Sequence, residues 1–589
     1  MRSIVSLMLL VPAFVFAVSL QPVTVLPDDG KVVPSSSQSG SGPSHEARFT
    51  IGTVDTVGGT TYDWLSNGPA YRMLTQTSGR GIHVVWMYSA DLSNTTFPDR
   101  NMRYNFYDYS SRAWNWIDPD FMLSGVNVFA TRTGYGSMDV DPSGVAVISA
   151  HHSTGSGDPD FAPIIARDAD VGAGIFDYAP GEPDINYYEW PFLSVGTNSA
   201  IQLAMIDATS QDNLFSGRST TWQTWDTPVG IPSPQPEPMF CDQNIATSKV
   251  AGSNKVCISW VATTGVAGYS QDPGFYRESQ DGGTTWDTPV DLGFPPAFSP
   301  GSESVPSWHI TSLFPLYDKQ DRLHFVGNVG PYVRDTNWIL PGEIWHWCAS
   351  NPDTWNRIHI ASPESLNANV GYNVMICARP SLGEDGDGNL FVAWEEFDGV
   401  NVEQTTSRVR ADIWYSASTD NGVTWDSAVR ITDGGSVSYR FPSILSPIDD
   451  TVMVTYLIDQ VAGFLLYNEG AGTNNPIVVQ KWENPYDGVA EGPRTVPPSQ
   501  MEVAVGPNPF GRSTRLSYAV PYRGNVSLDI FDAAGRNVRT LANGRSEPGR
   551  FSVAWDGRSQ SGALVPEGVY LYRYALDGKH VTGKLTLTR

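Results

Sequence analysis

Two octapeptides, Ser279–Trp286 (SQDGGTTW) and Ser418–Trp425 (STDNGVTW), share the pattern Ser-x-Asp-x-Gly-x-Thr-Trp. The Asp carboxylate of such a segment can accept backbone N–H groups of its own turn, and its Gly permits a positive φ. The pattern therefore predicts a tight hairpin between two strands, after which the Trp packs between sheets. The residues expected to build the two turns are Asp281, Gly283, Trp286, Asp420, Gly422 and Trp425.

The two turns belong to a longer repeat. Seven short apolar runs begin 55 to 67 residues apart, at Ile82, Val145, Ile201, Val256, Leu323, Leu390 and Val452. β-branched and aromatic residues dominate the runs, which predicts strands. Four short strands per repeat are typical of a propeller blade. We therefore predict an all-β fold with a seven-bladed β-propeller over residues 48–484, and six or eight blades stay open. Tandem sandwich domains would need longer units with linkers of their own.

The composition agrees with many short strands and turns, because the chain of 589 residues has 56 Gly, 43 Pro and 12% aromatic residues. Its 62 acidic and 37 basic side chains give a net charge of -25. Nucleic-acid binding requires clustered Lys and Arg to neutralise phosphates, so we expect no nucleic-acid partner.

Both ends of the chain differ from its middle. Residues 1–17 combine Arg2, an apolar run and Ala17 as in a secretory signal peptide, and the run is too short to span a membrane comfortably. Residues 18–47 and 485–502 are expected to be linkers, and residues 503–589 a small Ig-like β-sandwich because apolar residues alternate there. We therefore expect an exported protein without a membrane span.

The two octapeptides resemble the Asp-box, or BNR repeat, of the sialidase-like propeller superfamily. Sialidases of that family also carry three arginines that hold the substrate carboxylate, and a Phe/Tyr-Arg-Ile-Pro motif in the first blade. The nearest match here, Tyr439–Pro442, lies in the seventh repeat. Arg379 aligns with Phe441 rather than with Arg440, and successive strand residues face opposite ways. We therefore expect the two arginines not to converge, which leaves the resemblance as one of fold.

The C-terminal segment carries four ordered motifs, Pro507–Phe510, Leu528–Arg536, Trp555–Arg558 and Gly568–Arg573, before the closing residues 583–589. These motifs resemble the FlgD-like Ig domain and the C-terminal sorting domain of type IX secretion. The resemblance implies a Gram-negative bacterium, the type IX secretion machinery as a partner, and a secreted or outer-membrane cell-surface location. An adhesive Ig-like domain is the alternative.

Long connections between the second and third strands of the blades, such as residues 87–101, 329–342 and 395–410, indicate one functional face. The aromatic and charged residues expected to bind a ligand there are Tyr332, Arg334, Asp335 and Trp338. The catalytic candidates are Glu395, Glu396, Asp398 and Arg440, since a glycosidase needs paired carboxylates. Adjacent Glu395 and Glu396 should nevertheless point to opposite sides of their strand.

Cofactors are not clearly indicated. Asp385, Asp387 and Asn389 alternate oxygen donors as in a calcium loop, but they also fit a plain hairpin turn. His151 and His152 with Asp158 and Asp160 match no strong metal template.

The four cysteines are predicted to form two disulfides, Cys241 with Cys257 and Cys348 with Cys377, because an exported chain meets an oxidising compartment.

Together these patterns favour a secreted or cell-surface propeller that binds an extracellular glycan or protein without catalysis. A sialidase-like glycoside hydrolase or a lyase is one alternative, and a structural surface-layer component is another.

Overall fold

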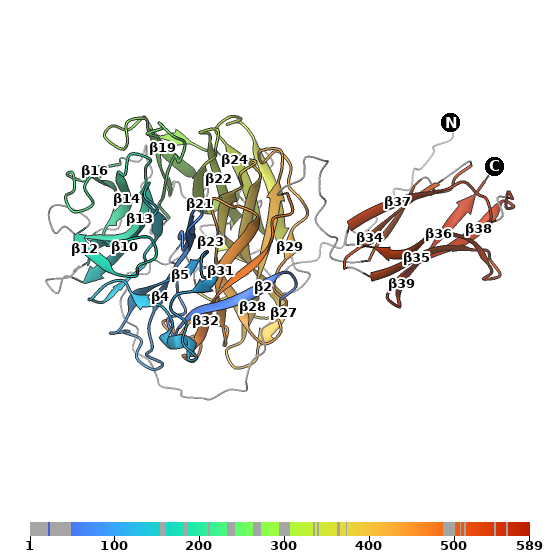
Figure 1. Ribbon diagram of the computed structural model, residues 1–589, viewed down its shortest axis with the longest axis horizontal. Coiled ribbons are helices and arrows are strands. Elements are labelled where there is room, and N and C mark those ends of the chain that lie inside the picture. Colours follow the sequence, from blue (N-terminus) through green and yellow to red (C-terminus); the bar gives the residue numbers. More distant parts are fainter. Residues whose placement is uncertain are drawn as a thin grey trace, which may run out of the picture. The chain divides into compact units, whose positions relative to one another are not determined.

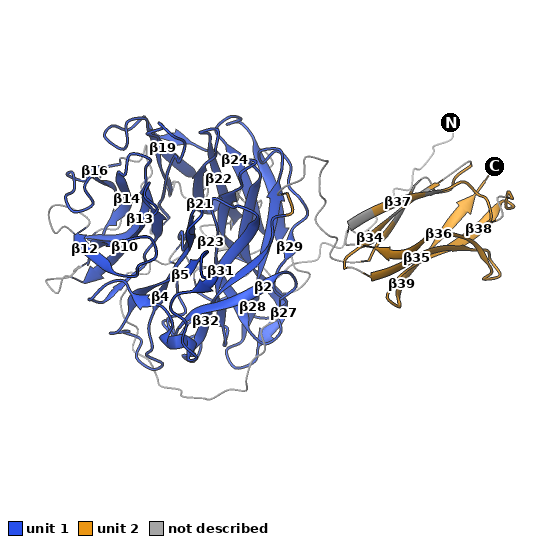
Figure 2. Ribbon diagram, in the orientation of Figure 1, with its two compact units in different colours: residues 1–484 blue, residues 485–589 orange. Residues whose placement is uncertain are grey.

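The structure is a computed structural model in which the chain divides into two compact units, residues 1–484 and 485–589 (Figure 2). The residues that it describes are 22–23, 49–66, 68–153, 161–180, 187–209, 213–231, 242–262, 273–293, 307–333, 336–338, 341–361, 366–372, 374–486, 501–506, 508–511, 514–522, 524–546, 549–560 and 563–588. The predicted signal peptide, residues 1–17, lies outside them.

The described residues of the first unit form seven antiparallel sheets, which follow one another around the unit in chain order (Figure 1). Blade one contains β3 (Leu74–Thr77), β4 (Gly81–Tyr88), β5 (Asn101–Asp108), β6 (Ala113–Trp114) and β7 (Val126–Asn127). Blade two contains β8 (Thr133–Gly134), β9 (Met138–Val140), β10 (Ala146–Ser153), β11 (Phe161–Asp168) and β12 (Phe176–Pro180). Blade three contains β13 (Tyr188–Val195), β14 (Ile201–Asp207), β15 (Leu214–Ser219) and β16 (Val229–Gly230).

Blade four contains β17 (Asn244–Thr247), β18 (Val256–Val261), β19 (Gly274–Ser279) and β20 (Val290–Asp291). Blade five contains β21 (Ser307–Tyr317), β22 (Leu323–Val333), β24 (Gly342–Cys348) and β25 (Trp355–Ala361), and its sheet is extended by β23 (Thr336–Trp338) and β1 (Pro22–Val23). Blade six contains β26 (Cys377–Glu384), β27 (Leu390–Glu403), β28 (Arg408–Ser418) and β29 (Val429–Arg430). The described residues contain one short 3-10 helix, η1 (Phe121–Leu123), and no α-helix.

The seventh blade combines both ends of the unit and closes the ring. Its strands are β30 (Ser438–Ile444), β31 (Thr451–Asp459), β32 (Asn475–Glu483) and β2 (Thr53–Thr60). The N-terminal strand β2 pairs antiparallel with β32, from Thr53 opposite Lys481 to Thr60 opposite Asn475. The predicted all-β fold with a seven-bladed propeller is therefore confirmed.

Serine hydroxyls join the first strands of neighbouring blades. Ser381 Oγ accepts a hydrogen bond from Ile444 N at 3.0 Å, and Ser443 Oγ accepts one from Met73 N at 3.0 Å. Equivalent bonds run from Leu193 N to Ser137 Oγ at 2.8 Å and from Thr247 N to Ser194 Oγ at 3.1 Å. Because an unpaired buried N–H is costly, these hydroxyls satisfy a requirement of the ring. They also explain why the repeats carry a Ser in their first strands.

The two octapeptides form the predicted hairpins, between β19 and β20 and between β28 and β29. Asp281 Oδ1 accepts Thr285 N at 2.8 Å, and Gly283, at φ +81°, donates its N–H to Ser279 Oγ at 2.8 Å. Asp420 and Gly422 repeat these contacts with Thr424 and Ser418. Trp425 lies edge-on to His346 of the preceding blade, so this turn also contributes to packing between blades.

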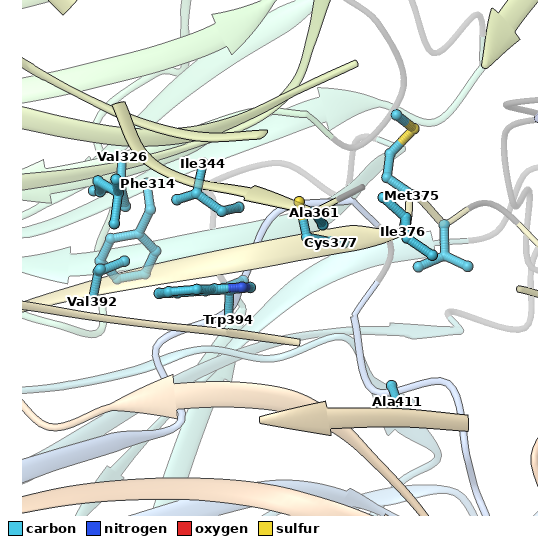
Figure 3. Packing of buried hydrophobic residues seen from close by; sticks show 14 of the residues in the cluster. Phe314, Val326, Ile344, Ala361, Met375, Ile376, Cys377, Val392, Trp394 and Ala411 are labelled. Atoms are coloured by element: carbon cyan, nitrogen blue, oxygen red, sulfur yellow. The ribbon is translucent and has the colours of Figure 1, made fainter. Parts of the chain in front are cut away.

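The hydrophobic core lies between adjacent sheets. Val326 and Ile344 of blade five face Val392 and Trp394 of blade six, and all four side chains are fully buried (Figure 3). The other face of blade five carries Phe325 and Trp347, which belong to a separate core cluster with residues of blade four. Apolar residues therefore cover both faces of β22 and β24, as expected of a sheet that is packed on two sides.

The second unit is a two-sheet β-sandwich, as predicted. One sheet has the order β33 (Val503–Gly506), β34 (Thr514–Val520), β37 (Gly549–Trp555). The other has the order β36 (Asn537–Ser546), β35 (Gly524–Phe531), β38 (Gly568–Leu576), β39 (Lys579–Leu587). Trp555 and Tyr574 are fully buried in its core. In neither unit does the described part of the chain include a helix able to cross a membrane.

The predicted disulfides need correction, because Cys257, Cys348 and Cys377 are free thiols. Cys377 lies beside Gly342 at the start of β24, whereas Cys348 ends that strand. Six residues of strand separate the two positions by roughly 20 Å, far beyond the reach of a disulfide. Cys257 lies opposite Ala246 on β17, and its expected partner Cys241 falls outside the described residues.

Candidate functional site

Two buried polar clusters lie on the long-loop face, which we define as the side carrying the connections between blades and between second and third strands. The arginine–glutamate cluster consists of Arg379, Glu395 and Arg440. The tyrosine–histidine cluster consists of Tyr62, Arg100, Tyr135 and His151. Arg379, Arg440 and Tyr135 lie at or just before the starts of first strands, and Glu395 and His151 lie on second strands. Tyr62 lies in the connection from β2 to blade one, and Arg100 in the connection from β4 to β5.

Glu395, which is fully buried, holds the arginine–glutamate cluster together. Its Oε1 lies 2.6 Å from Arg379 Nη1, and its Oε2 lies 3.1 Å from Arg440 Nε and 2.8 Å from Phe441 N. Since Glu395 and Arg379 belong to blade six and Arg440 to blade seven, the cluster fastens these two blades to each other.

The convergence of Arg379 and Arg440 contradicts the prediction that they point apart. The register shifts by one residue between Ala378 and Ser381 on β26 and between Arg440 and Ser443 on β30. Arg379 and Phe441, the residues before the two prolines, have φ of 54° and 59°. A β-bulge breaks the alternation of side chains, and the rule that separated these arginines assumed an unbroken strand.

Glu395 is unsuited to donate a proton. Burial opposes its ionisation, but Arg440, Arg379 and the N–H of Phe441 outweigh burial and lower its pKa. Glu396 faces the other side of β27, as predicted, with Oε2 3.2 Å from Trp394 Nε1 and 2.9 Å from His359 Nε2. Asp398 accepts a hydrogen bond from Val400 N in the irregular part of β27. The predicted carboxylates therefore do not form the facing pair of a glycosidase.

A second pair of acids, Asp63 and Asp459, lies beside Arg440. Asp63 Oδ2 accepts Leu465 N at 2.7 Å, while Asp63 Oδ1 and Asp459 Oδ2 have no hydrogen-bond partner among the described residues. Burial raises the pKa of Asp63 to about 7, and burial together with the charge of Asp63 raises the pKa of Asp459 well above its usual value. The pair therefore retains a proton near neutral pH.

The tyrosine–histidine cluster combines a cation, a base and two phenols. Arg100 Nη1 lies 3.3 Å from Tyr62 Oη, and Arg100 Nη2 lies 3.3 Å from His151 Nε2. Tyr62 Oη and Tyr135 Oη are 2.7 Å apart. Burial, followed by the charges of Arg100 and Arg132, lowers the pKa of His151 well below its usual value. Because a guanidinium only donates, it faces a lone pair of a neutral imidazole.

The segment Thr61–Ser66 connects the two clusters. Tyr62 extends into the tyrosine–histidine cluster, and Asp63 contacts Leu465 of blade seven. The Trp64 ring lies 5.3 Å from the Arg379 guanidinium carbon, and Ser66 Oγ accepts from Arg379 Nε at 3.4 Å. A shift of this buried segment would therefore affect both clusters at once.

The predicted ligand-binding residues stay predictions. Tyr332 and Trp338 belong to β22 and β23, which pair as a hairpin with Tyr332 opposite Asn337. Their side chains are not described, and Arg334 and Asp335 lie outside the described residues.

The Asp385–Asn389 segment forms the hairpin between β26 and β27. Asp385 Oδ1 accepts Asp387 N at 3.0 Å and Asn389 N at 2.8 Å, and Oδ2 accepts the side-chain amides of Asn389 and Asn484. These donors occupy the carboxylate, so the geometry supports the plain turn rather than a calcium loop. Within the described residues, no group of three His, Cys, Asp or Glu side chains is placed to hold a metal ion.

Sequence reasoning considered His151 only as a metal ligand and missed the other members of the tyrosine–histidine cluster, although one signal was available. Tyr135, Trp190, Arg379 and Phe441 all have φ between 50° and 59° in the first strands of four blades, and three of them precede a proline. Aligning the repeats on this bulge position would have identified Tyr135 as a residue of the long-loop face. Arg100 carries no comparable signal.

Comparison with known proteins adds one sequence match and several distant structural ones. Residues 521–578 match the family model of the FlgD Ig-like domain. No curated protein matches the chain. A polysaccharide lyase of family PL25, an ulvan lyase bound to -[GlcA(1-4)Rha3S]-, is 11% identical, with 72% of this chain and 95% of that chain covered and a TM-score of 0.42.

Two further solved structures are similar at the same level. The α-L-arabinofuranosidase Arb93A from Fusarium graminearum is 12% identical over 64% of this chain and 96% of its own, with a TM-score of 0.32. The Hadza microbial sialidase Hz136 is 14% identical over 72% of this chain and 68% of its own, with a TM-score of 0.32. At these values the likeness concerns the fold alone and transfers no residue role.

Proposed function

We propose that the protein is an exported, carbohydrate-active propeller that binds an acidic glycan on its long-loop face and cleaves it by β-elimination. The observation that carries this proposal is the contact of Arg100 with both the neutral His151 and the hydrogen-bonded phenols of Tyr62 and Tyr135. Binding without catalysis, as favoured by the sequence, accounts for neither the neutral base nor the phenol pair.

The cluster contains the groups that elimination from a uronate requires. A guanidinium holds a carboxylate and stabilises the charge that develops on it. The proton on the carbon next to that carboxylate passes to the neutral imidazole of His151, the bond to the glycosidic oxygen breaks, and a carbon–carbon double bond forms. A phenol returns a proton to the departing oxygen. Hydrolysis by Glu395 and Glu396 is disfavoured, because one is held between arginines and the other faces away.

The four side chains of the tyrosine–histidine cluster are at most 4% exposed to solvent. Phe97, in the connection between β4 and β5, packs edge-on against Tyr62 with ring centroids 4.7 Å apart. The proposal therefore requires this connection to move when the glycan binds, as lids do in many enzymes.

The test is turnover of a panel of polyuronates, followed by the ultraviolet absorbance of the unsaturated product. Tyr135→Phe removes one hydroxyl of the pair and should lower kcat by about 100-fold or more. Tyr109→Phe is the matched control, since the Tyr109 hydroxyl binds Gln76 in blade one, outside the cluster. Glycan binding without turnover by the wild-type protein would show the catalytic part to be wrong. Failure to bind any acidic glycan would contradict the whole proposal.

We further propose that residues 503–589 direct export by the type IX secretion machinery to the cell surface or the medium of a Gram-negative bacterium. The FlgD Ig-like match at residues 521–578 and the closing motif support this role. Deleting residues 500–589 should retain the propeller in the periplasm, as cell fractionation can measure. Normal surface delivery of the truncated chain would instead favour the adhesive alternative.

A further inference from the structure

A cluster of titratable side chains that the proposed function does not use lies at the opposite end of blade five. The thiol cluster consists of Asp318, His324, His346 and Cys348. Asp318 opens the turn between β21 and β22, while His324 and Cys348 are direct cross-strand partners on β22 and β24. Because the first-to-second turns and the Asp420 hairpin lie at this end, the cluster is separate from the long-loop face.

The hydrogen bonds fix where the protons of the two imidazoles lie. His346 Nδ1 is 3.1 Å from the carbonyl oxygen of Gly422, which can only accept, so this nitrogen carries a proton. His346 Nε2 is then the lone pair of a neutral ring, consistent with a pKa that burial and the charge of His324 lower well below the usual value. His346 Nε2 therefore accepts a hydrogen bond from His324 Nδ1, which lies 2.9 Å away.

His324 carries a proton on Nε2 as well as on Nδ1. His324 Nε2 lies 3.1 Å from Asp318 Oδ2, and Arg322 binds the same carboxylate oxygen, which keeps Asp318 ionised. Both nitrogens of His324 therefore donate, which makes the ring an imidazolium. Burial opposes this charge, but the hydrogen bonds with Asp318 and Cys348 outweigh burial and raise the pKa of His324.

Cys348 lies next to this cation. Its Sγ is 3.7 Å from His324 Nε2, 3.0 Å from Ser350 Oγ and 4.0 Å from Asn421 Nδ2. The His324 imidazolium, whose Nε2 faces the sulfur, is the neighbouring group that favours a thiolate at Cys348. The other charged groups around the cluster are Arg322, which binds Asp318, Lys319 in the same turn, and the acids Glu384 on β26 and Asp420 in the following hairpin.

The other two described thiols have no such neighbour. Cys257 and Cys377 are fully buried, and burial followed by nearby glutamates raises the pKa of both well above the usual value. Cys348 is 6% exposed, and Ser350, which contacts its sulfur, is exposed. Burial raises the pKa of the Cys348 thiol, but the hydrogen bond and charge of His324 outweigh burial, so the pKa is lowered. Among the described thiols, Cys257 and Cys377 are therefore internal controls for an activated Cys348.

We propose that Cys348 is a modification site, a nucleophilic thiolate paired with the His324 imidazolium that exchanges with small disulfides. The Cys348 sulfur attacks one sulfur of the disulfide, a mixed disulfide forms, the S–S bond of the reagent breaks, and the second half leaves as a thiolate. Electrons balance without a further oxidant. The mixed disulfide leaves the Cys348 sulfur without a negative charge beside His324. The modification therefore also changes the hydrogen bonds that run from His324 through His346 to Gly422.

The test measures the reaction of the full-length native protein with dithiobis(nitrobenzoate) as a function of pH, with peptide mapping of the product. Cys348 should be labelled with an apparent pKa at least about one unit below the 8.5 of a free cysteine, and Cys257 and Cys377 only after unfolding. His324→Gln should slow the labelling below pH 7 by about 10-fold and restore an ordinary profile.

His309→Gln is the control for replacing a buried histidine, since His309 lies in the same blade on β21. Circular dichroism and the melting temperature confirm folding of both variants. The wild-type profile decides the question even if a variant fails to fold. An ordinary thiol profile at Cys348, absence of label there, or an unchanged rate in folded His324→Gln would each overturn the proposal.

Discussion

Replacing Glu395 by Gln should be among the most destabilising single changes in the propeller. Glu395 accepts hydrogen bonds from Arg379 Nη1 at 2.6 Å, Arg440 Nε at 3.1 Å, Arg440 Nη2 at 3.3 Å and Phe441 N at 2.8 Å. Glutamine keeps the shape but removes the carboxylate that bridges two buried guanidinium groups, and its amide directs a donor at other donors. Breaking such a buried ion pair costs about 3 to 5 kcal/mol.

Guanidinium chloride unfolding of the propeller, analysed for midpoint and slope, measures this loss. Glu396→Gln is the matched control, because the neighbouring carboxylate faces the other side of β27 and its side chain is 15% exposed. Glutamine at this position keeps an oxygen that can accept from Trp394 Nε1, so the change should cost about 1 kcal/mol. Equal and small effects of the two substitutions would refute the argument that Glu395 fastens blades six and seven.

The pH dependence of the same measurement provides a second check. The folded pKa of Glu395 is lowered, so its contribution is present above the unfolded pKa of about 4.3 and is lost as the pH falls through the folded value. The difference in stability between the wild type and Glu395→Gln should therefore shrink below about pH 4. A difference that is constant down to strongly acidic pH would contradict the ionised state of Glu395.

Three further predictions concern other parts of the molecule. Asp63 has a folded pKa of about 7, above its unfolded value, so the wild type loses stability as the pH rises from about 4 to about 7. Asp63→Asn should flatten this decline in urea unfolding curves, and an unchanged slope would argue against the shared proton. Ser443→Ala leaves the buried N–H of Met73 unpaired and should cost about 1 to 3 kcal/mol, whereas exposed Ser143→Ala should cost little. Residues 1–484, expressed without the second unit, should melt at the temperature of the propeller transition in the full chain, and a much lower calorimetric melting temperature would contradict independent folding.

Part of the candidate site was accessible from the sequence. Glu395 and Arg440 were catalytic candidates, and the opposite orientation of Glu395 and Glu396 followed from strand alternation. Arg379 was separated from Arg440 by the same rule, which failed at the two bulges because each inserts an extra residue. The predicted disulfide between Cys348 and Cys377 is also wrong, because the position of the two thiols along β24 depends on how the blades pack. Cys348 ends that strand, whereas Cys377 of β26 lies beside its first residue, Gly342.

The sequence by itself determined the features that depend on local chemistry. A hairpin at Ser279–Trp286 is held by hydrogen bonds within eight residues, and strands are short and apolar wherever the repeat recurs, so both are visible without any contact at long range. Only the tertiary structure decided which distant groups meet. Tyr62, Arg100, Tyr135 and His151 come together because blades one and two pack side by side and the segment after β2 lies against both. No spacing along the chain encodes that meeting, since it depends on the register and bulges of strands that pair across the fold.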